Sequence, residues 1–261
     1  MGHDLIVKPR GFVPFAMVLA AAITVACAPI PGFEDIMADD GKASQAQGVA
    51  EQQSSAREGG ALTRKSTTLA GDNFAEDVVL ARTLTEEYWA QQFAADGREY
   101  RPIQRFIPYV GRNGPACGDQ PAVPDNAFYC PIGHFVAFDE RWLEELYDKI
   151  GDGAVYVIIP HELGHAVQAQ LTSDFRLNKN RELQADCYAG AVIGWLVQAK
   201  RLTKEEGDDE ELFANLAAAG DPTDEWWRPD AHGTGPERQQ AFQFGYDRGI
   251  EACRGYADPT P

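Results

Sequence analysis

Hydrophobic side chains recur at helical intervals early in the chain. Large apolar residues there are four apart: Leu80, Leu84 and Tyr88, and then Trp89 and Phe93. This spacing places them on one face and predicts a helix over 74–95. Residues 100–110 and 128–138 are expected to form strands. Pro131 indicates that the second strand lies at the edge of a sheet, because proline cannot donate to a central ladder.

Downstream of residue 138 the pattern changes to helices. Asp139 is placed to cap a helix whose apolar residues are Trp142, Leu143, Leu146 and Tyr147. Residues 155–159 form a buried run, and Pro160 follows it. We expect Pro160 to kink the next helix, and the alternative is that it occupies the first turn of that helix.

The C-terminal third is expected to be helical as well. One helix is predicted over 182–201 and another over 209–219. Capping-box patterns begin at Thr203 and at Thr234, and each pattern marks the start of a helix. The last of these helices carries Phe242, Tyr246 and Ile250.

The run His161-Glu162-Leu163-Gly164-His165 directly follows Pro160. Residues four apart share one face of a helix, so both imidazoles can reach a single metal ion. Glu162 is then placed to hold and deprotonate a metal-bound water. The pattern predicts a metal-dependent hydrolase, provided that a third ligand exists.

Glu182 and Asp186 are also four apart, on the predicted helix 182–201. A polar link over 172–180 is long enough to turn this helix back against the first. We expect Glu182 to be the third ligand and Asp186 to accept the free ring N–H of a ligand histidine. Two imidazoles and one carboxylate favour a single zinc ion. The alternative is an ordinary solvated helix face, against which the small and apolar neighbours argue.

The N-terminus is typical of an export signal. Lys8 and Arg10 precede an apolar stretch that ends at Cys27, and the end of that stretch is similar to a bacterial lipobox. Residues 1–27 are therefore expected to be a signal with lipidation at Cys27. An uncleaved membrane anchor and ordinary secretion remain alternatives. The protein is expected to be exported and anchored at the cell envelope.

Composition divides the rest of the chain. Residues 28–71 are rich in small and polar types and nearly lack aromatics, which predicts a flexible tether. Residues 72–255 form the expected metallopeptidase domain, and residues 256–261 a frayed tail. The formal net charge is −17, which excludes nucleic acid as a natural partner.

Removing Cys27 leaves four cysteines, an even number in an exported chain. Cys117 and Cys130 bracket a loop rich in glycine and proline, so we pair them and leave Cys187 to pair with Cys253. The second disulfide would tie the Glu182 helix to the C-terminal helix. The competing interpretation is that Cys187 binds the metal itself.

With these pieces in place, the chain resembles the bacterial family of putative neutral zinc metallopeptidases from about residue 73 to 255. The segments that carry the resemblance are residues 128–131, 138–139, 161–168, 182–190 and 232–253, and the run Glu-Leu-Gln-Ala-Asp-Cys at 182–187 is specific to the family. The resemblance implies an α+β zincin-like domain, mainly helical with a small edge sheet. It also implies one zinc ion and peptidase activity. The His, His, Glu ligand set is that of the gluzincins.

The function expected from these residues is hydrolysis of peptide bonds in a peptide or protein substrate. Glu162 would be the general base, and His232 or Tyr188 would stabilise the oxyanion. The strand 128–138 would offer its edge to an extended substrate. The rival hypothesis is a non-catalytic envelope scaffold that is stabilised by zinc and the disulfides.

Overall fold

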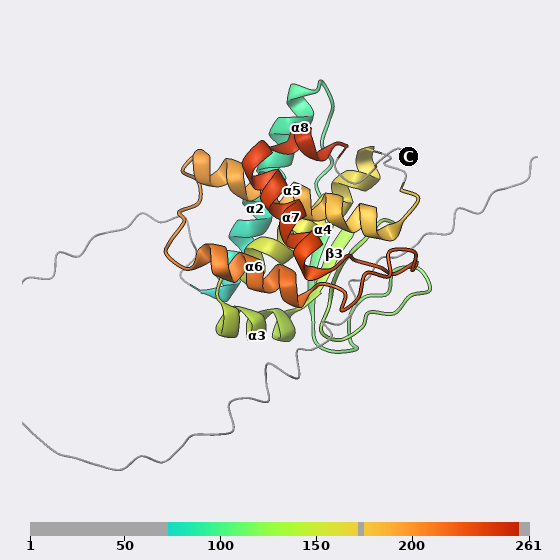
Figure 1. Ribbon diagram of the computed structural model, residues 1–261. Coiled ribbons are helices and arrows are strands. Elements are labelled where there is room, and N and C mark those ends of the chain that lie inside the picture. Colours follow the sequence, from blue (N-terminus) through green and yellow to red (C-terminus); the bar gives the residue numbers. More distant parts are fainter. Residues whose placement is uncertain (1–72, 172–174, 256–261) are drawn as a thin grey trace, which may run out of the picture.

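The computed structural model describes residues 73–171 and 175–255 (Figure 1). The expected signal, the lipidation site Cys27, the tether and the frayed tail lie outside these residues. Within the described part of the chain, no helix has the length and apolar character needed to cross a membrane.

Helices dominate the described residues and a small sheet accompanies them, which confirms the expected α+β class. The elements in chain order are α2 (Phe74–Ala95), β1 (Arg105–Tyr109), β2 (Ala127–Cys130), β3 (Phe135–Asp139), α3 (Glu140–Ile150), α4 (Gly153–Leu171), α5 (Asn178–Gln198), α6 (Asp208–Ala218), α7 (Gly235–Arg248) and α8 (Ile250–Cys253).

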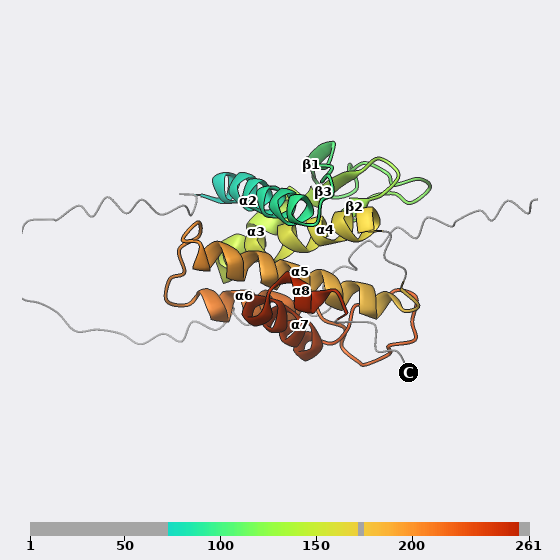
Figure 2. The same cartoon turned by 90° about the horizontal axis from the view of Figure 1, so that it is seen from above.

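Helix α4 lies in the middle of the molecule. Figure 2 shows α2 and the sheet on one side of it, and α5, α7 and α8 on the other. Nearly every α4 residue from Gly153 to Gln168 is therefore buried, as is typical of a helix that is apolar on all sides. Pro160 lies inside α4, well past its first turn. The first-turn alternative is wrong, and residues 155–159 belong to the same helix.

The sheet has the order β1-β3-β2, with β1 parallel and β2 antiparallel to β3. The expected single strand over 128–138 is wrong, because β2 and β3 form a hairpin. Pro131 begins the turn, where its missing N–H is not needed. His134 has a φ of 45°, a left-handed conformation that suits a tight turn. The hairpin leaves β2 at one edge of the sheet.

Side chains alternate between the two faces of the sheet along each strand, and each face packs into a core of its own. Tyr129, Val136 and Phe138 belong to the main core, which they share with α2, α4 and α5. On the opposite face Phe128 and Phe135 lie in a second, smaller core. The Cys117–Cys130 disulfide, which the sequence predicted, also lies in that second core.

Of the expected helix caps, the one at Asp139 is confirmed in position only, and the one at Thr203 is wrong. Asp139 occupies the N-cap position of α3 without a capping hydrogen bond. Its carboxylate instead accepts from the backbone N–H groups of Gly111 and Asp125, at 3.0 and 3.1 Å. The pattern at Thr203 starts no helix, because Gly207 precedes α6 in a left-handed conformation. The capping box at Thr234 is confirmed at the start of α7.

Helices α5 and α7 pack with their backbones in close approach. A Cβ atom on Gly190 would collide with the carbonyl of Phe242, and one on Gly245 with the carbonyl of Cys187. The predicted Cys187–Cys253 disulfide then joins α5 to α8. This packing fixes the position of α5 relative to the C-terminal helices, and α5 carries Glu182.

Candidate metal centre

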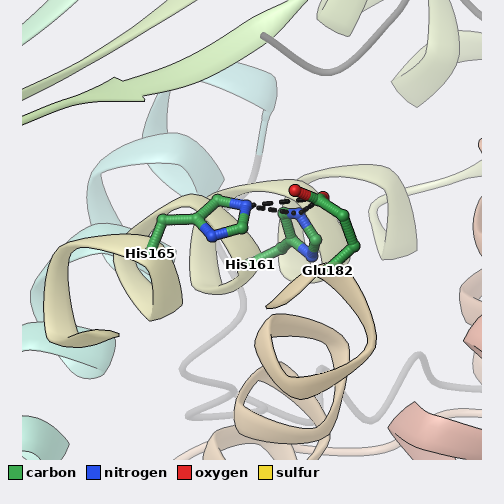
Figure 3. A group of neighbouring side chains, drawn as sticks. All are labelled: His161, His165 and Glu182. Atoms are coloured by element: carbon green, nitrogen blue, oxygen red, sulfur yellow. Dashed lines mark hydrogen bonds and ion pairs between the residues drawn. The ribbon is translucent and has the colours of Figure 1, made fainter. Parts of the chain in front are cut away.

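Helices α4 and α5 bring three candidate ligands together (Figure 3). His161 and His165 lie on α4, with their Nε2 atoms 3.1 Å apart. Glu182 lies on α5, with Oε2 3.3 Å from His161 Nε2 and 3.5 Å from His165 Nε2. All three side chains are buried. The structure therefore places the three residues that the sequence predicted as ligands within reach of one ion.

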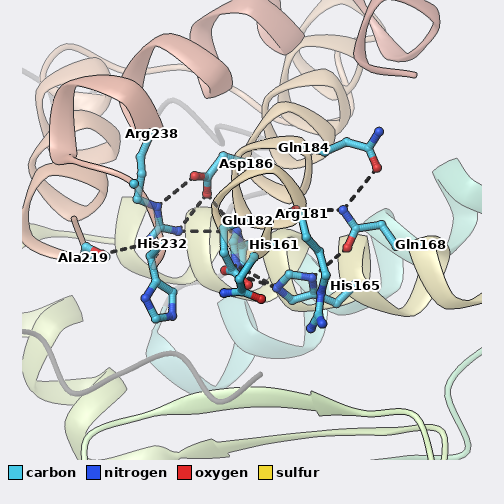
Figure 4. Close-up of polar contacts among 12 residues, drawn as sticks. His161, His165, Gln168, Arg181, Glu182, Gln184, Asp186, Ala219, His232 and Arg238 are labelled. Atoms are coloured by element: carbon cyan, nitrogen blue, oxygen red, sulfur yellow. Dashed lines mark hydrogen bonds and ion pairs between the residues drawn. The ribbon is translucent and has the colours of Figure 1, made fainter. Parts of the chain in front are cut away.

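The outer nitrogens of both imidazoles are held by acceptors. His161 Nδ1 lies 2.8 Å from Asp186 Oδ1, and His165 Nδ1 lies 2.9 Å from Gln168 Oε1 (Figure 4). The amide nitrogen of Gln168 donates to the carbonyl oxygen of Arg181 at 2.8 Å, so its oxygen must face His165. Partners that only accept assign the ring protons to Nδ1. Each Nε2 atom then carries a lone pair.

This assignment makes a metal ion fit the site. Two Nε2 lone pairs and a carboxylate point at one another with no proton between them, and such a group repels itself unless a cation lies at its centre. Neither oxygen of Glu182 has a hydrogen-bond partner. Two imidazoles and one carboxylate are the donor set that zinc accepts at catalytic sites. The residues thus fit Zn²⁺.

The electrostatics of Glu182 agree with this role. Burial by itself raises the pKa of its carboxyl, but without an ion the protonated imidazoles of His165 and His161 oppose that effect, at the position where a bound cation would place its charge. The net result is a pKa well below the usual range. Glu182 is therefore a carboxylate at neutral pH, as a metal ligand must be.

Asp186 is the expected partner of His161, and an arginine stands behind it. Arg238 on α7 donates from Nε to Asp186 Oδ2 and from a terminal nitrogen to Asp186 Oδ1, both at 2.8 Å. A third hydrogen bond of 2.8 Å joins Arg238 to the carbonyl oxygen of Ala219. Burial by itself raises the pKa of Asp186. Arg238 and His161 lower this pKa by more than burial raises it, so the net shift is downward.

Glu162 and His232 line one cavity next to His161. Glu162 is completely buried. His232 comes from the loop that precedes α7, and its Nε2 atom is buried without a hydrogen-bond partner. Its ring lies 3.8 Å from a carboxylate oxygen of Asp221, and its backbone N–H donates to the other oxygen at 2.7 Å. This loop is thereby held at the edge of the site.

Two other expected participants lie elsewhere. Tyr188 packs edge-on against Trp89 at 5.1 Å, in the aromatic part of the core. There burial raises its pKa to about 12, and it does not line the cavity of Glu162. Cys187 is held in its disulfide, so the interpretation of Cys187 as a metal ligand is wrong.

Sequence reasoning assigned no role to Gln168 or Arg238. Gln168 lies three residues after His165 on the same helix face, which was the available signal for a partner of that imidazole. Arg238 is distant in sequence, 52 residues from Asp186. The one sequence signal for Arg238 was its position in residues 232–253, a segment that resembles the metallopeptidase family.

Relatives of this chain are found in several bacteria. The chain is 33% identical over 200 residues to the uncharacterized protein YpfJ of Escherichia coli K12, which covers 67% of this chain and 68% of the relative. It is 29% identical over 185 residues to the uncharacterized proteins Mb2605 of Mycobacterium bovis and Rv2575 of Mycobacterium tuberculosis, covering 57% of this chain and 60% of each relative. No solved structure matches it significantly.

The comparison with protein families extends over most of the sequence. Residues 16–256 match the profile of a family described as "Putative neutral zinc metallopeptidase". That range includes every residue of the buried cluster described above. From the family match and the convergent ligand geometry together, we conclude that this chain belongs to the neutral zinc metallopeptidase family.

Proposed function

We propose that the protein is a zinc-dependent peptidase in which Glu162 is the general base. One observation carries the proposal. The unprotonated acceptors of His161, His165 and Glu182 converge in a buried cluster, and the carboxyl group of Glu162 is buried on the adjoining cavity wall. A metal site of three protein ligands beside a carboxylate is the arrangement used by zinc hydrolases.

Zn²⁺, when bound, would polarise the peptide carbonyl and acidify a water molecule. Glu162 would accept the proton of that water and then pass it to the leaving amine. His232 is the candidate donor for the oxyanion, because its buried Nε2 atom has no partner in the described part of the chain.

Positioning residues keep the ligands in the required tautomer. Asp186, held by Arg238, orients His161, and Gln168 orients His165. These contacts fix both rings before the ion arrives, so less ordering is needed on binding.

The substrate backbone would bind along β2. This strand pairs only with β3 among the described strands, and its residue Ala127 lines the cavity beside Glu162. An extended peptide can add to a sheet edge through main-chain hydrogen bonds. All four residues of β2 are buried, so binding along β2 requires the segment that covers it to move aside. The sequence predicted that the whole segment 128–138 offers this edge, and we now propose β2 alone in that role.

We place this activity at the cell envelope. The proposal rests on the signal-like N-terminus with Cys27. The two disulfides support it, since such bonds persist in oxidising compartments. Mass spectrometry of the membrane fraction would detect acylation of Cys27, and a mature protein that retains an unmodified N-terminus would exclude it.

The test of the proposed function uses the purified full-length chain. Zinc content is measured first, and a peptide library is then incubated with wild type, with Glu162→Gln and with chelated protein. We expect Glu162→Gln to keep its zinc and to lose activity by about 10²–10⁴-fold. Glu144→Gln, on the exposed side of α3, is the matched control and should behave as wild type. Full zinc content without cleavage that depends on Glu162 would favour the non-catalytic scaffold.

A further inference from the structure

The cavity beside His161 and Glu162 has a largely apolar wall, and we call the space along this wall the recess. The whole cavity, including the part beside Glu162, has a volume of about 40 Å³. Beyond the site residues themselves, it is lined by Ala127, Trp142, Val157, Ile158, Asn215 and Ala219. These residues come from β2, α3, α4 and the α6 segment, so four parts of the fold enclose the recess.

Apart from Glu162 and His232, which belong to the reaction site, the wall offers no unused charge to a ligand. Arg238 reaches the recess, but its guanidinium is engaged by Asp186 and by the carbonyl of Ala219. The amide nitrogen of Asn215 donates to the carbonyl of Glu211 at 2.9 Å. A charged side chain that entered would lose its hydration without gaining a counter-ion from the wall. An aliphatic side chain would instead gain from the removal of its surface from water.

The volume limits the size of the group that fits. The whole cavity holds roughly three water-sized groups, so the side chain of valine is about the largest that the recess accepts. Phenylalanine is too large for the recess as it stands. Trp142 forms the bulkiest part of the wall, and Ala219 forms one of the smallest parts. These two positions therefore control the space.

We propose that this recess is the specificity pocket of the enzyme and that it selects a compact aliphatic residue next to the cleaved bond. The inference rests on the proposed function, because it assumes that a peptide lies across Glu162. It names the substrate class of that same site: peptides with valine or a residue of similar size beside the scissile bond.

Binding and cleavage are measured separately, so that the two proposals can fail separately. The probes are capped glycine pentapeptides with one central variable residue: Gly, Val, Phe, Asp or Lys. Binding is measured by calorimetry on zinc-loaded full-length Glu162→Gln protein, and cleavage by mass spectrometry with the wild type. We expect the Val peptide to bind about tenfold more tightly than the Gly peptide. The Asp and Lys peptides should bind no better than Gly.

Two variants change the pocket in opposite directions. Trp142→Leu enlarges it and should shift the preference from Val towards Phe. Ala219→Leu narrows it and should remove most of the advantage of Val over Gly. Trp89→Leu is the matched control, because Trp89 is also a buried tryptophan but lies against Tyr188, outside the recess. Ratios between peptides cancel any general loss of stability or of zinc.

Each outcome decides one proposal. Cleavage of all five peptides at equal rates, with equal affinities, would overturn the pocket and leave the peptidase. Selective binding of Val without any cleavage by the wild type would overturn the peptidase and leave the pocket. Tightest binding of Asp or Lys would overturn the apolar pocket, and the absence of both binding and cleavage would overturn both proposals.

Discussion

Replacing Arg238 with methionine tests whether the ion pair behind His161 supports both folding and metal binding. Arg238 and Asp186 are 3% and 0% exposed, and two hydrogen bonds of 2.8 Å join them. Methionine fills a similar volume without a charge. The substitution therefore leaves the Asp186 carboxylate buried, with the imidazole of His161 as its remaining side-chain partner.

The magnitude follows from those contacts. A hydrogen bond to a charged group contributes about 1.5–3 kcal/mol, so two of them amount to about 3–6 kcal/mol. Breaking a buried ion pair from one side costs about 3–5 kcal/mol. We expect Arg238→Met to lower the free energy of unfolding by about 3–5 kcal/mol. Zinc affinity should also fall about 10–100-fold, because the orienting partner of His161 is itself no longer held.

Urea unfolding of chelated protein measures the stability term, and competition with a zinc indicator measures the affinity. Arg254→Met is the control, because Arg254 is about half exposed in its pairs with Asp96 and Glu251, and each such exposed pair contributes about 1 kcal/mol or less. The double variant Arg238→Met with Asp186→Leu should recover much of the lost stability, since it buries no unpaired charge. If Arg238→Met unfolds within 1 kcal/mol of the Arg254 control, the buried pair does not have the role assigned to it.

Three further predictions concern stability. Burial, with Asp208 next in importance, raises the pKa of Asp152 to about 6. Because the pKa of Asp152 is higher in the folded state, its ionisation destabilises the fold as the pH rises from about 4 through 6. The free energy of unfolding of Asp152→Asn at pH 8 should therefore exceed that of the wild type by about 1–2 kcal/mol, after allowance for solvent screening. Gly190→Ala should destabilise by about 3 kcal/mol or more through its collision with the α7 backbone, whereas Gly164→Ala should be tolerated, since its Cβ meets its neighbours at 3.4 Å or more. The free energy of unfolding of zinc-free protein should be about 4 kcal/mol lower than that of protein in zinc at a thousandfold excess over Kd.

Controls for these predictions come from the same chain. Asp148→Asn changes an exposed carboxylate on α3, so its unfolding curve at pH 8 should match that of the wild type. An equal gain at Asp148 and Asp152 would point to net charge rather than to the buried site. The glycine variants are compared by their denaturation midpoints, and similar midpoints would contradict the close approach of α5 and α7. Thermal scans with and without chelator that coincide would contradict a stabilising ion.

Local features of the sequence predicted a large part of this structure. Helix α2 begins and ends where its apolar spacing indicates, and the side chain of Asn73 accepts from the N–H of Glu76 at its start. Thr234 begins α7 as its capping box requires. One failure came from a local signal that was given too little weight. Pro131 and Gly133 interrupt the segment 128–138 and are typical of a turn, and the two halves of the segment pair as the β2–β3 hairpin.

The candidate site also has features that the sequence predicted and features that only the tertiary structure decided. Sequence alone determined that His161 and His165 share one helix face, because a spacing of four residues is a property of any α-helix. It also paired Glu182 with Asp186 for the same reason. Only the tertiary structure decided that α7 brings Arg238 to Asp186, that Gln168 turns its oxygen to His165, and that β2, α3 and α6 enclose an apolar recess. The Arg238 contact and the recess join segments far apart in the chain, and the amide of Gln168 is oriented by the carbonyl of Arg181 on α5. Their geometry depends on how whole helices and strands pack, which local spacing does not contain.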